Sequence, residues 1–249
     1  MKKIITTLFI AFTFLNSHAQ FDLLKKHVSK DSSKSIFKNA TKIFPSSGNL
    51  LNDDIINGLK EALTIGTINS SKILNTPDGF FTNAAIKVLM PEEAKKVEST
   101  LRNLGMSSLV DKAILSMNRA AEDAAGGVSA IFIDAIKNMT VTDGINILKG
   151  DDFAATTYLK KMTTSELTVK MRPVIETSLA KVNATQHWEA VFKNYNKFSN
   201  KKVETDLATY VTTKALDGLF YSISLEEQKI RKDPAAQVTD LLKKVFGGK

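Results

Sequence analysis

Residues 137–159 read KNMTVTDGINILKGDDFAATTYL, and this stretch contains the clearest helix-start and helix-stop signals in the chain. Thr140 lies three residues before Asp143, the spacing of a capping box, in which each side chain hydrogen-bonds the other residue's backbone N–H. Gly150 suits the position just past a helix, where a left-handed backbone is common. The stretch therefore predicts a short helix between Thr140 and Gly150 and a second helix after it.

The three aspartates of the same stretch raise the alternative of a metal loop. Calcium loops carry acidic residues at alternate positions around a central glycine. Asp143 is separated from Asp151 by the predicted helix, and Asp151 or Asp152 is well placed to cap the next helix. We therefore predict no metal site. Asp143 is kept as a candidate pocket residue, because a capping carboxylate can also face a ligand.

Helical signals continue towards the N-terminus, where apolar residues recur at the three- and four-residue spacing of an amphipathic helix. Helices are expected from Asn52 or Asp53 to the NTPDG turn at 75–79, from Pro91 to Gly105, from Ser107 or Ser108 to Gly126-Gly127, and from Val128 to Met139. Residues 80–90, FFTNAAIKVLM, have some strand character. Because they are short and isolated, they predict an extended connection.

Helical signals also continue towards the C-terminus. Thr163-Thr164-Ser165-Glu166 has the pattern of a capping box for a helix that must accommodate Pro173. Further helices are expected in a segment capped by Thr185, over residues 205–232, and after Asp233-Pro234. Strand alternation is absent, so the sequence predicts a single all-α globular domain of about eight helices over residues 52–249.

Residues 1–19 have the pattern of a cleaved secretory signal peptide. Lys2 and Lys3 supply positive charge, residues 4–15 form a short apolar core, and Ser17-His18-Ala19 provides small residues at a cleavage site. The apolar run is shorter than the ~20 residues that span a bilayer. We expect an exported protein, with the periplasm favoured over secretion, a flexible leader at residues 20–51, and no transmembrane segment in the mature chain.

The chain contains no cysteine and carries a net charge of +8, which falls to +6 when Lys2 and Lys3 leave with the signal peptide. The absence of cysteine excludes disulfides, thiol nucleophiles and cysteine-ligated metal clusters. A basic exported protein could contact anionic lipid or polysaccharide. The lysines are scattered, without a dense patch interleaved with aromatics, so we expect a solvated basic surface and no nucleic-acid partner.

The motifs of common catalytic and cofactor sites are missing from the sequence. Only His27 and His187 follow the signal peptide, so a histidine-based zinc site or a Ser-His-Asp triad would depend on one of them. No H-E-x-x-H or E-x-x-H pattern and no glycine-rich phosphate loop occurs. We therefore predict no catalytic residue, metal or cofactor.

Several charged residues lie close to or within apolar helical faces. Such charges usually pair with one another in a structural ion-pair network. The alternative is a polar pocket between helices that holds a small anionic or amphipathic ligand, or an envelope component. The candidate pocket residues are Glu61, Arg119, Glu122, Asp134, Asp143, Arg172 and Asp217.

Nine short stretches between residues 46 and 248 occur together, in the same order, in one family: GLKEALTIGT, PDGFFTN, SMNRAAEDA, IFIDAIKNMTVTD, ILKGDDFAATTYL, RPVIETSL, YVTTKALDGLF, IRKDPAAQ and TDLLKKVFG. Through them the chain resembles the bacterial domain-of-unknown-function family 4197. The resemblance implies a predominantly helical, exported protein of Gram-negative bacteria, and it assigns no activity and no catalytic residue. Gly144 departs from the alanine usual in the family, and glycine costs up to ~1 kcal/mol within a helix.

The sequence leaves three functions open. A non-enzymatic ligand- or partner-binding protein of the cell envelope is favoured, because catalytic motifs are missing and charged residues lie among apolar faces. A carboxylate-dependent hydrolase of envelope material would need two accessible carboxylates at a defined separation. A basic surface protein would bind anionic lipid or polysaccharide in a salt-dependent way.

Overall fold

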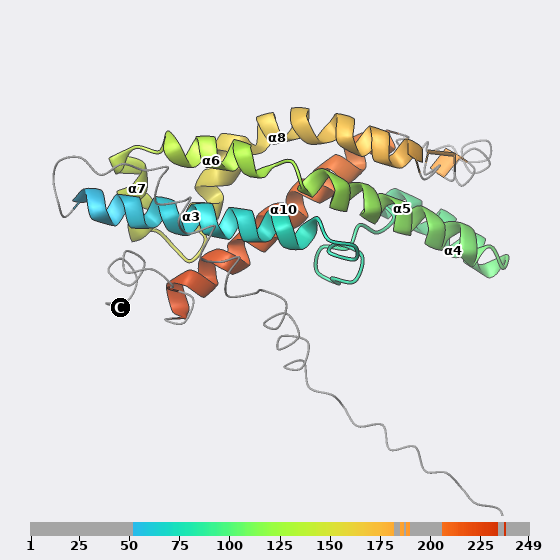
Figure 1. Cartoon of the computed structure of the whole chain (residues 1–249). Helices are drawn as coiled ribbons and strands as arrows, with labels where there is room; N and C mark the ends of the chain where they lie inside the picture. Colours follow the sequence, from blue (N-terminus) through green and yellow to red (C-terminus); the bar gives the residue numbers. More distant parts are fainter. Residues whose placement is uncertain (1–51, 182–184, 187, 190–205, 234–236, 238–249) are drawn as a thin grey trace, which may run out of the picture.

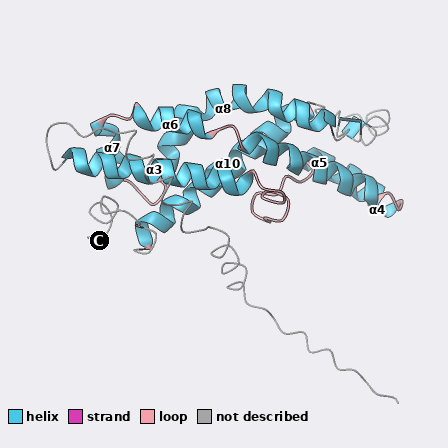
Figure 2. Ribbon diagram, viewed as in Figure 1, coloured by secondary structure: helices cyan, strands magenta, loops and turns pink. Residues whose placement is uncertain are grey.

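The described part of the chain is all-α, as predicted. The computed structural model describes residues 52–181, 185–186, 188–189, 206–233 and 237, and these contain seven α-helices, one short 3-10 helix and no strand (Figure 1; Figure 2). The elements are α3 (Asn52–Leu74), η1 (Glu92–Ala94), α4 (Lys95–Asn103), α5 (Ser107–Ala125), α6 (Ser129–Lys137), α7 (Val141–Lys149), α8 (Ala154–Lys181) and α10 (Leu207–Lys232). The signal peptide, the leader, both histidines and the helix expected after Asp233-Pro234 lie outside the described residues.

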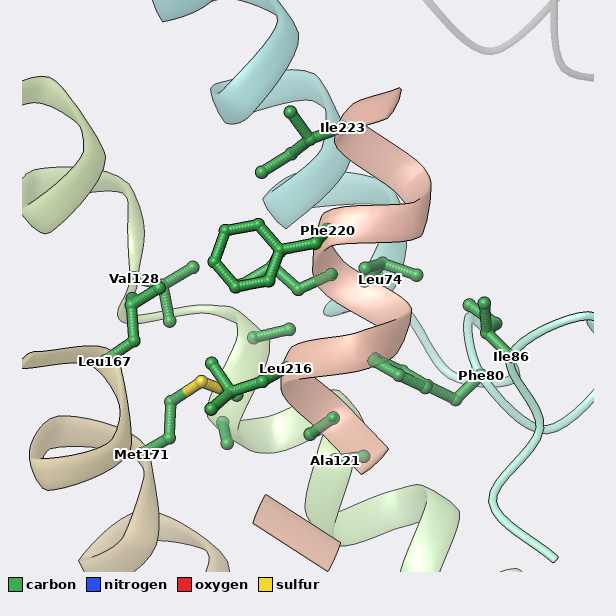
Figure 3. Close-up of a cluster of buried hydrophobic side chains, with 14 of the residues drawn as sticks. Leu74, Phe80, Ile86, Ala121, Val128, Leu167, Met171, Leu216, Phe220 and Ile223 are labelled. Carbon is green, nitrogen blue, oxygen red and sulfur yellow. The ribbon is translucent and has the colours of Figure 1, made fainter. Parts of the chain in front are cut away.

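Helix α10 runs through the middle of the domain and packs against α8, α3 and α5. Figure 1 shows it crossing the other long helices obliquely. Its apolar face carries buried Leu216, Phe220 and Ile223, which lie in the main hydrophobic cluster (Figure 3). Phe132 of α6 meets Phe220 edge-on, with ring centroids 6.0 Å apart. Because several elements share α10 as a neighbour, it sets their relative positions.

The helix start predicted at Thr140 is confirmed. Thr140 Oγ1 accepts a hydrogen bond from the Asp143 backbone N–H at 3.1 Å, and the Asp143 carboxylate accepts one from the Thr140 backbone N–H at 3.0 Å. The hydroxyl and the backbone N–H of Thr140 together lower the pKa of Asp143. The two residues therefore form the expected capping box at the start of α7.

Two glycines end helices in different ways. Gly105 follows α4 with a left-handed φ of 77°, as expected. Gly150 follows α7 with an extended backbone, φ −76° and ψ −175°, so the left-handed conformation predicted there was wrong. A Cβ at Gly150 would lie 2.5 Å from the Ala154 Cβ and 3.0 Å from the Asn146 carbonyl oxygen. Glycine is thus required at this position for space, because neighbouring atoms occupy the volume of a side chain.

Helix α8 is continuous from Ala154 to Lys181, so the separate helix predicted to begin at residues 163–166 was wrong. Thr163 is buried, and its hydroxyl donates to the Leu159 carbonyl one turn earlier, a bond that Thr can make inside a helix. Pro173 lacks the N–H that would bond to the Val169 carbonyl. Val169 is 73% exposed, so water can reach that carbonyl and the helix continues.

Gly144 allows α7 to approach α3 closely. The residue is buried, and a Cβ at this position would collide with Ile56 Cδ1 of α3. An alanine here would therefore require the Ile56 side chain to move. The departure from the usual alanine coincides with close packing between two helices, which offsets the lower helix propensity of glycine.

Candidate functional site

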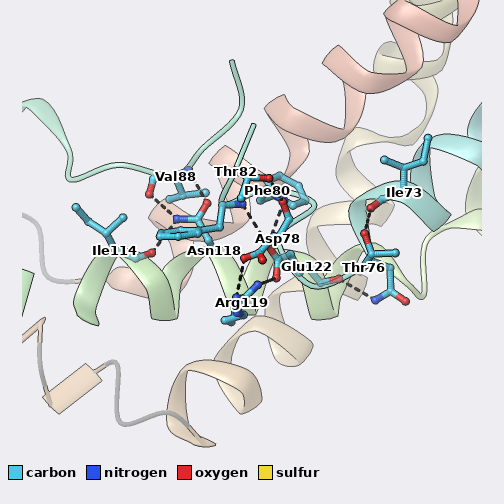
Figure 4. A network of polar contacts seen from close by, with 12 residues as sticks. Ile73, Thr76, Asp78, Phe80, Thr82, Val88, Ile114, Asn118, Arg119 and Glu122 are labelled. Carbon is cyan, nitrogen blue, oxygen red and sulfur yellow. Dashed lines mark hydrogen bonds and ion pairs between the residues drawn. The ribbon is translucent and has the colours of Figure 1, made fainter. Parts of the chain in front are cut away.

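Glu122 of α5 anchors the loop between α3 and η1, residues 75–91, which we call the connecting loop. Its Oε1 accepts hydrogen bonds from the backbone N–H groups of Phe80 at 3.1 Å and Phe81 at 3.2 Å. The Asn75 side chain donates to the Glu122 backbone carbonyl at 2.8 Å. Figure 4 shows the carboxylate pointing from α5 into the loop. The buried carboxylate thus has hydrogen-bond partners in the loop amides. These bonds fix the position of Phe80 and Phe81 against α5.

Arg119 links the same carboxylate to the tip of the connecting loop. Its Nη1 donates to Glu122 Oε2 at 2.6 Å, and its Nη2 donates to Asp78 Oδ1 at 2.8 Å (Figure 4). These hydrogen bonds, that to Glu122 first, raise the pKa of Arg119. Asp78 has a left-handed backbone with φ 69°, a conformation that aspartate tolerates better than most residues. The ion pair therefore holds a turn that few other residues would favour.

Asn118 holds the far end of the connecting loop in an extended conformation. Its Oδ1 accepts from the Val88 N–H at 2.9 Å, and its Nδ2 donates to the Val88 carbonyl at 2.8 Å and to the Ile114 carbonyl at 2.8 Å. One amide group satisfies both backbone groups of Val88, as a neighbouring strand would do. Tyr210 of α10 donates its hydroxyl to the Leu89 carbonyl at 2.8 Å. The loop is therefore bonded to α5 on one edge and to α10 on the other.

Gly218 of α10 lets the connecting loop pack directly against that helix. A Cβ at Gly218 would lie 2.5 Å from Phe80 Cε1 and 3.2 Å from Ile86 Cβ. Phe80 is completely buried, and Figure 3 shows its ring and Ile86 beside α10. The PDGFFTN and YVTTKALDGLF stretches therefore meet in space, although about 130 residues separate them in the sequence.

An open groove of about 720 Å³ lies between the connecting loop and α10. We call it the loop–α10 groove. It is lined by side chains of the loop, of η1 and α4, and of one face of α10: Ala85, Ile86, Lys87, Leu89, Met90, Pro91, Glu92, Lys95, Tyr210, Lys214, Asp217, Gly218 and Tyr221. Its volume is in the range of small-molecule and peptide sites. Among these side chains, Leu89 and Tyr221 are apolar or aromatic and exposed.

Three lysines and two carboxylates line the groove, an excess of one positive charge. Lys95 Nζ lies 2.7 Å from Glu92 Oε1, and Lys214 Nζ lies 3.9 Å from Asp217 Oδ2. Lys87 Nζ lies 3.9 Å from the centroid of the Phe81 ring. Lys87 has no carboxylate partner within the described residues, so its ammonium group is the charge in the groove best placed to meet an anion.

Four of the seven residues predicted for a pocket lie around this region or in the core. Arg119 and Glu122 are brought together, and their contacts match the structural ion-pair network. Asp217 lines the groove and is exposed. Glu61 is buried on α3 and lines no part of the groove. Whether any of them binds a ligand stays a prediction.

The other three predicted residues lie apart from the groove and from one another. Asp134 is exposed on α6 and pairs loosely with Lys137 at 3.8 Å. Asp143 caps α7. Arg172 of α8 donates to Glu176 and to Asp206, both at 2.9 Å, and so ties α8 to the start of α10. Each of these charges has a structural partner nearby.

A buried ion pair that sequence reasoning missed joins α10 to the 137–159 stretch. The Glu227 carboxylate accepts from the backbone N–H groups of Ala155 at 3.0 Å and Thr156 at 2.8 Å, and so caps α8. Arg231 donates to Glu227 at 2.8 Å and to the Ile147 carbonyl at 3.0 Å. Glu and Arg four residues apart on a helix were a detectable signal for the pair. No signal in the sequence indicated that this pair packs against the start of α8.

The groove residues were also missed. Tyr210, Lys214, Asp217 and Tyr221 follow one another at spacings of four, three and four residues, which places them on one face of a helix. That polar and aromatic face was a signal from which the α10 side of the groove could have been predicted. Lys87 and Leu89 carried no comparable signal, because their position depends on how the loop folds back.

Within the described ranges, no group of three or more His, Cys, Asp or Glu side chains could hold a metal ion. In the part of the chain that the structure describes, no helix combines the length and apolarity needed to cross a bilayer.

Comparison with known proteins gives one match. A family model described as "Protein of unknown function (DUF4197)" matches residues 49–247. No curated protein and no solved structure matches the chain. The family match covers well over half of the chain, including every element of the groove and of the two buried ion-pair networks. The chain belongs to the DUF4197 family of proteins of unknown function.

Proposed function

We propose that this protein is a non-enzymatic binding protein of the cell envelope, and that the loop–α10 groove holds an anionic or amphipathic ligand. The observation that carries the proposal is the groove itself, which holds exposed Leu89 and Tyr221 together with Lys87, an ammonium group that pairs with no carboxylate in the described part of the chain. A binding site of this kind offers charge attraction and apolar contact at the same place. The rigidly bonded loop supports the proposal, because a preformed site loses little entropy on binding.

The two groove carboxylates favour binding over hydrolysis. Acid–base catalysis needs a carboxyl group that is poised to exchange a proton with the substrate. Glu92 and Asp217 each lie beside a lysine three residues away in the sequence. Each carboxylate is thus paired with a lysine, which suits a role in setting the charge pattern of the groove.

The export part of the proposal rests on residues 1–19 alone. The charged start, short apolar core and small residues before Gln20 support cleavage by a signal peptidase. Mass spectrometry of the intact protein from a periplasmic extract should find a chain that begins at Gln20. A chain that retains Met1 and stays in the cytoplasmic fraction would overturn this part.

Ligand binding is tested with laurate, an amphipathic anion, added to isotope-labelled mature protein and followed by NMR. Backbone signals of residues 85–95 and 210–221 should shift in a saturable way. The double variant Lys87→Glu/Lys214→Glu should weaken binding on the order of tenfold, because each substitution replaces an attraction by a repulsion. Lys170→Glu is the matched control, since Lys170 is exposed on α8 and lies outside the groove. Shifts located elsewhere, or equal binding by both variants, would refute the proposal.

A further inference from the structure

We propose that the loop–α10 groove binds an extended acidic segment of a partner protein. This inference rests on the proposed function and names the class of ligand. It is carried by the backbone of the connecting loop, by the charge of the groove and by the spacing of its exposed side chains.

The backbone around Val88 has an edge that faces α10 and is only partly occupied, by the Tyr210 hydroxyl. Asn118 occupies the N–H and the carbonyl of Val88, so these groups point towards α5. In an extended chain, the backbone groups of the residues on either side point the opposite way. The Leu89 carbonyl follows this rule, because it accepts the Tyr210 hydroxyl from α10. The Lys87 carbonyl and the backbone groups of Leu89 therefore point towards the groove, while the Lys87 N–H donates to the Asn83 carbonyl at 2.8 Å within the loop.

Two groups on this edge are open. Within the described residues, the Leu89 N–H and the Lys87 carbonyl have no hydrogen-bond partner. One residue of an extended peptide could donate to the Lys87 carbonyl and accept from the Leu89 N–H, which is the pattern between parallel strands. Addition of a strand to an exposed backbone edge is a common mode of peptide recognition.

Charge and side-chain spacing select an acidic sequence with apolar residues between the acidic ones. Among the residues that the structure describes, no carboxylate pairs with Lys87, and the side chains that line the groove carry an excess of one positive charge. Side chains of an extended peptide alternate between two faces. One face can then place carboxylates near Lys87 and Lys214, while the other contacts exposed Tyr221. An acidic polysaccharide would satisfy the lysines, but it lacks the paired donor and acceptor that match the open edge.

The probe is a fluorescein-labelled ten-residue peptide of alternating Glu and Val, measured by fluorescence anisotropy with the full mature chain. A peptide with Lys in place of Glu tests charge. A peptide N-methylated at alternate residues tests the backbone edge, because it lacks the donors on one side. Oligogalacturonate and laurate are measured in parallel as a polysaccharide and a lipid-like anion. The protein variants are Lys87→Glu/Lys214→Glu, Leu89→Pro and the control Lys170→Glu.

The acidic peptide should bind, and the double lysine variant should weaken it on the order of tenfold, with Lys170→Glu unchanged. Leu89→Pro removes one N–H and keeps the preceding Val88 extended, so it should weaken the peptide about three- to tenfold more than it weakens laurate, which loses only its contact with the leucine side chain. The thermal midpoint of each variant reports whether it is folded, and the lysine variants keep the test valid if Leu89→Pro unfolds.

The other outcomes separate the two proposals. If oligogalacturonate or laurate binds through the groove lysines and the acidic peptide does not, the peptide inference is overturned and the binding function stands. Equal binding of the N-methylated and unmodified peptides would also overturn the inference that the peptide pairs with the backbone edge of the loop. If no probe depends on Lys87 and Lys214, both the inference and the proposed function fail.

Discussion

Replacing Glu122 by alanine should lower the free energy of unfolding by about 2–5 kcal/mol. The carboxylate is 4% exposed and accepts three hydrogen bonds, from the Phe80 and Phe81 amides and from Arg119. Alanine would leave the two amides without a partner, and an unsatisfied buried amide costs about 1–3 kcal/mol. The lost ion pair adds little, because the Arg119 side chain is 35% exposed and water can solvate it.

Two milder substitutions should lower the free energy of unfolding by smaller amounts. Glu122→Gln keeps one oxygen to accept both loop amides, but its NH2 group replaces the oxygen that accepts from Arg119 and sets two donors against each other, so it should cost about 1–2 kcal/mol. Asp78→Asn removes the exposed end of the network, where Asp78 is 48% exposed, and should cost less than about 1 kcal/mol. Asparagine also tolerates the left-handed backbone of this position, so the substitution tests the charge alone.

Urea unfolding followed by far-ultraviolet circular dichroism measures all three variants against the wild type. The expected order of destabilisation is Glu122→Ala, then Glu122→Gln, then Asp78→Asn. A loss below about 1 kcal/mol for Glu122→Ala would refute the argument that unpaired loop amides dominate. An Asp78→Asn variant as unstable as Glu122→Ala would instead show that the exposed ion pair carries the stability.

Three further predictions concern other parts of the fold. Glu227→Ala should cost about 3–5 kcal/mol in urea unfolding, because it uncaps α8 and leaves the Arg231 guanidinium, 9% exposed, without its carboxylate. Hydrogen bonds from Thr209 and then Arg172 lower the pKa of Asp206 from 3.8 to about 2. The stability advantage of the wild type over Asp206→Asn should therefore be fully present above about pH 4 and disappear as the pH falls towards 2, as followed by urea unfolding across that range. Partial exposure of Asp206 keeps this difference small, and a difference that grows on acidification would contradict the assignment. Gly218→Ala should cost about 1–3 kcal/mol in thermal or urea unfolding, since its methyl group would press on the Phe80 ring, and an unchanged stability would show that the loop can shift freely.

Local chemistry made some helix ends predictable, although the backbone conformation of Gly150 was not. The Thr140–Asp143 capping box and the left-handed Gly105 involve residues within one turn of each other, so their spacing in the sequence was sufficient. The same kind of pattern failed at residues 163–166, because Ser and Thr hydroxyls can also bond to a carbonyl one turn earlier inside a helix. The burial of Thr163 against other helices decides between the two, and burial depends on the fold.

The candidate site was predictable only in part, for the same reason. Arg119 and Glu122 could be selected from their place among apolar residues, but Glu122 accepts from backbone amides, and Arg119 donates to Asp78, in a loop about 40 residues earlier in the sequence. The groove arises where the connecting loop returns beside α10. Lys87 and Tyr210 are far apart in the sequence and acquire a shared role only in the folded chain.

The residues that hold the connecting loop in place differ from the residues that line the groove, so substitutions in the two sets should affect binding differently. Asn118, Arg119 and Glu122 use their polar groups on the connecting loop and do not line the groove. Their substitution should therefore alter binding only by releasing the loop, with a matching loss of stability. Substitution of Lys87 or Lys214 should alter binding while stability changes little, because Lys214 is exposed and Lys87 is only half-buried. A variant of Arg119 that kept full stability and lost binding would place the ligand at the loop network and not in the groove. Measuring stability and binding on the same variants thus locates the site independently of the identity of the ligand.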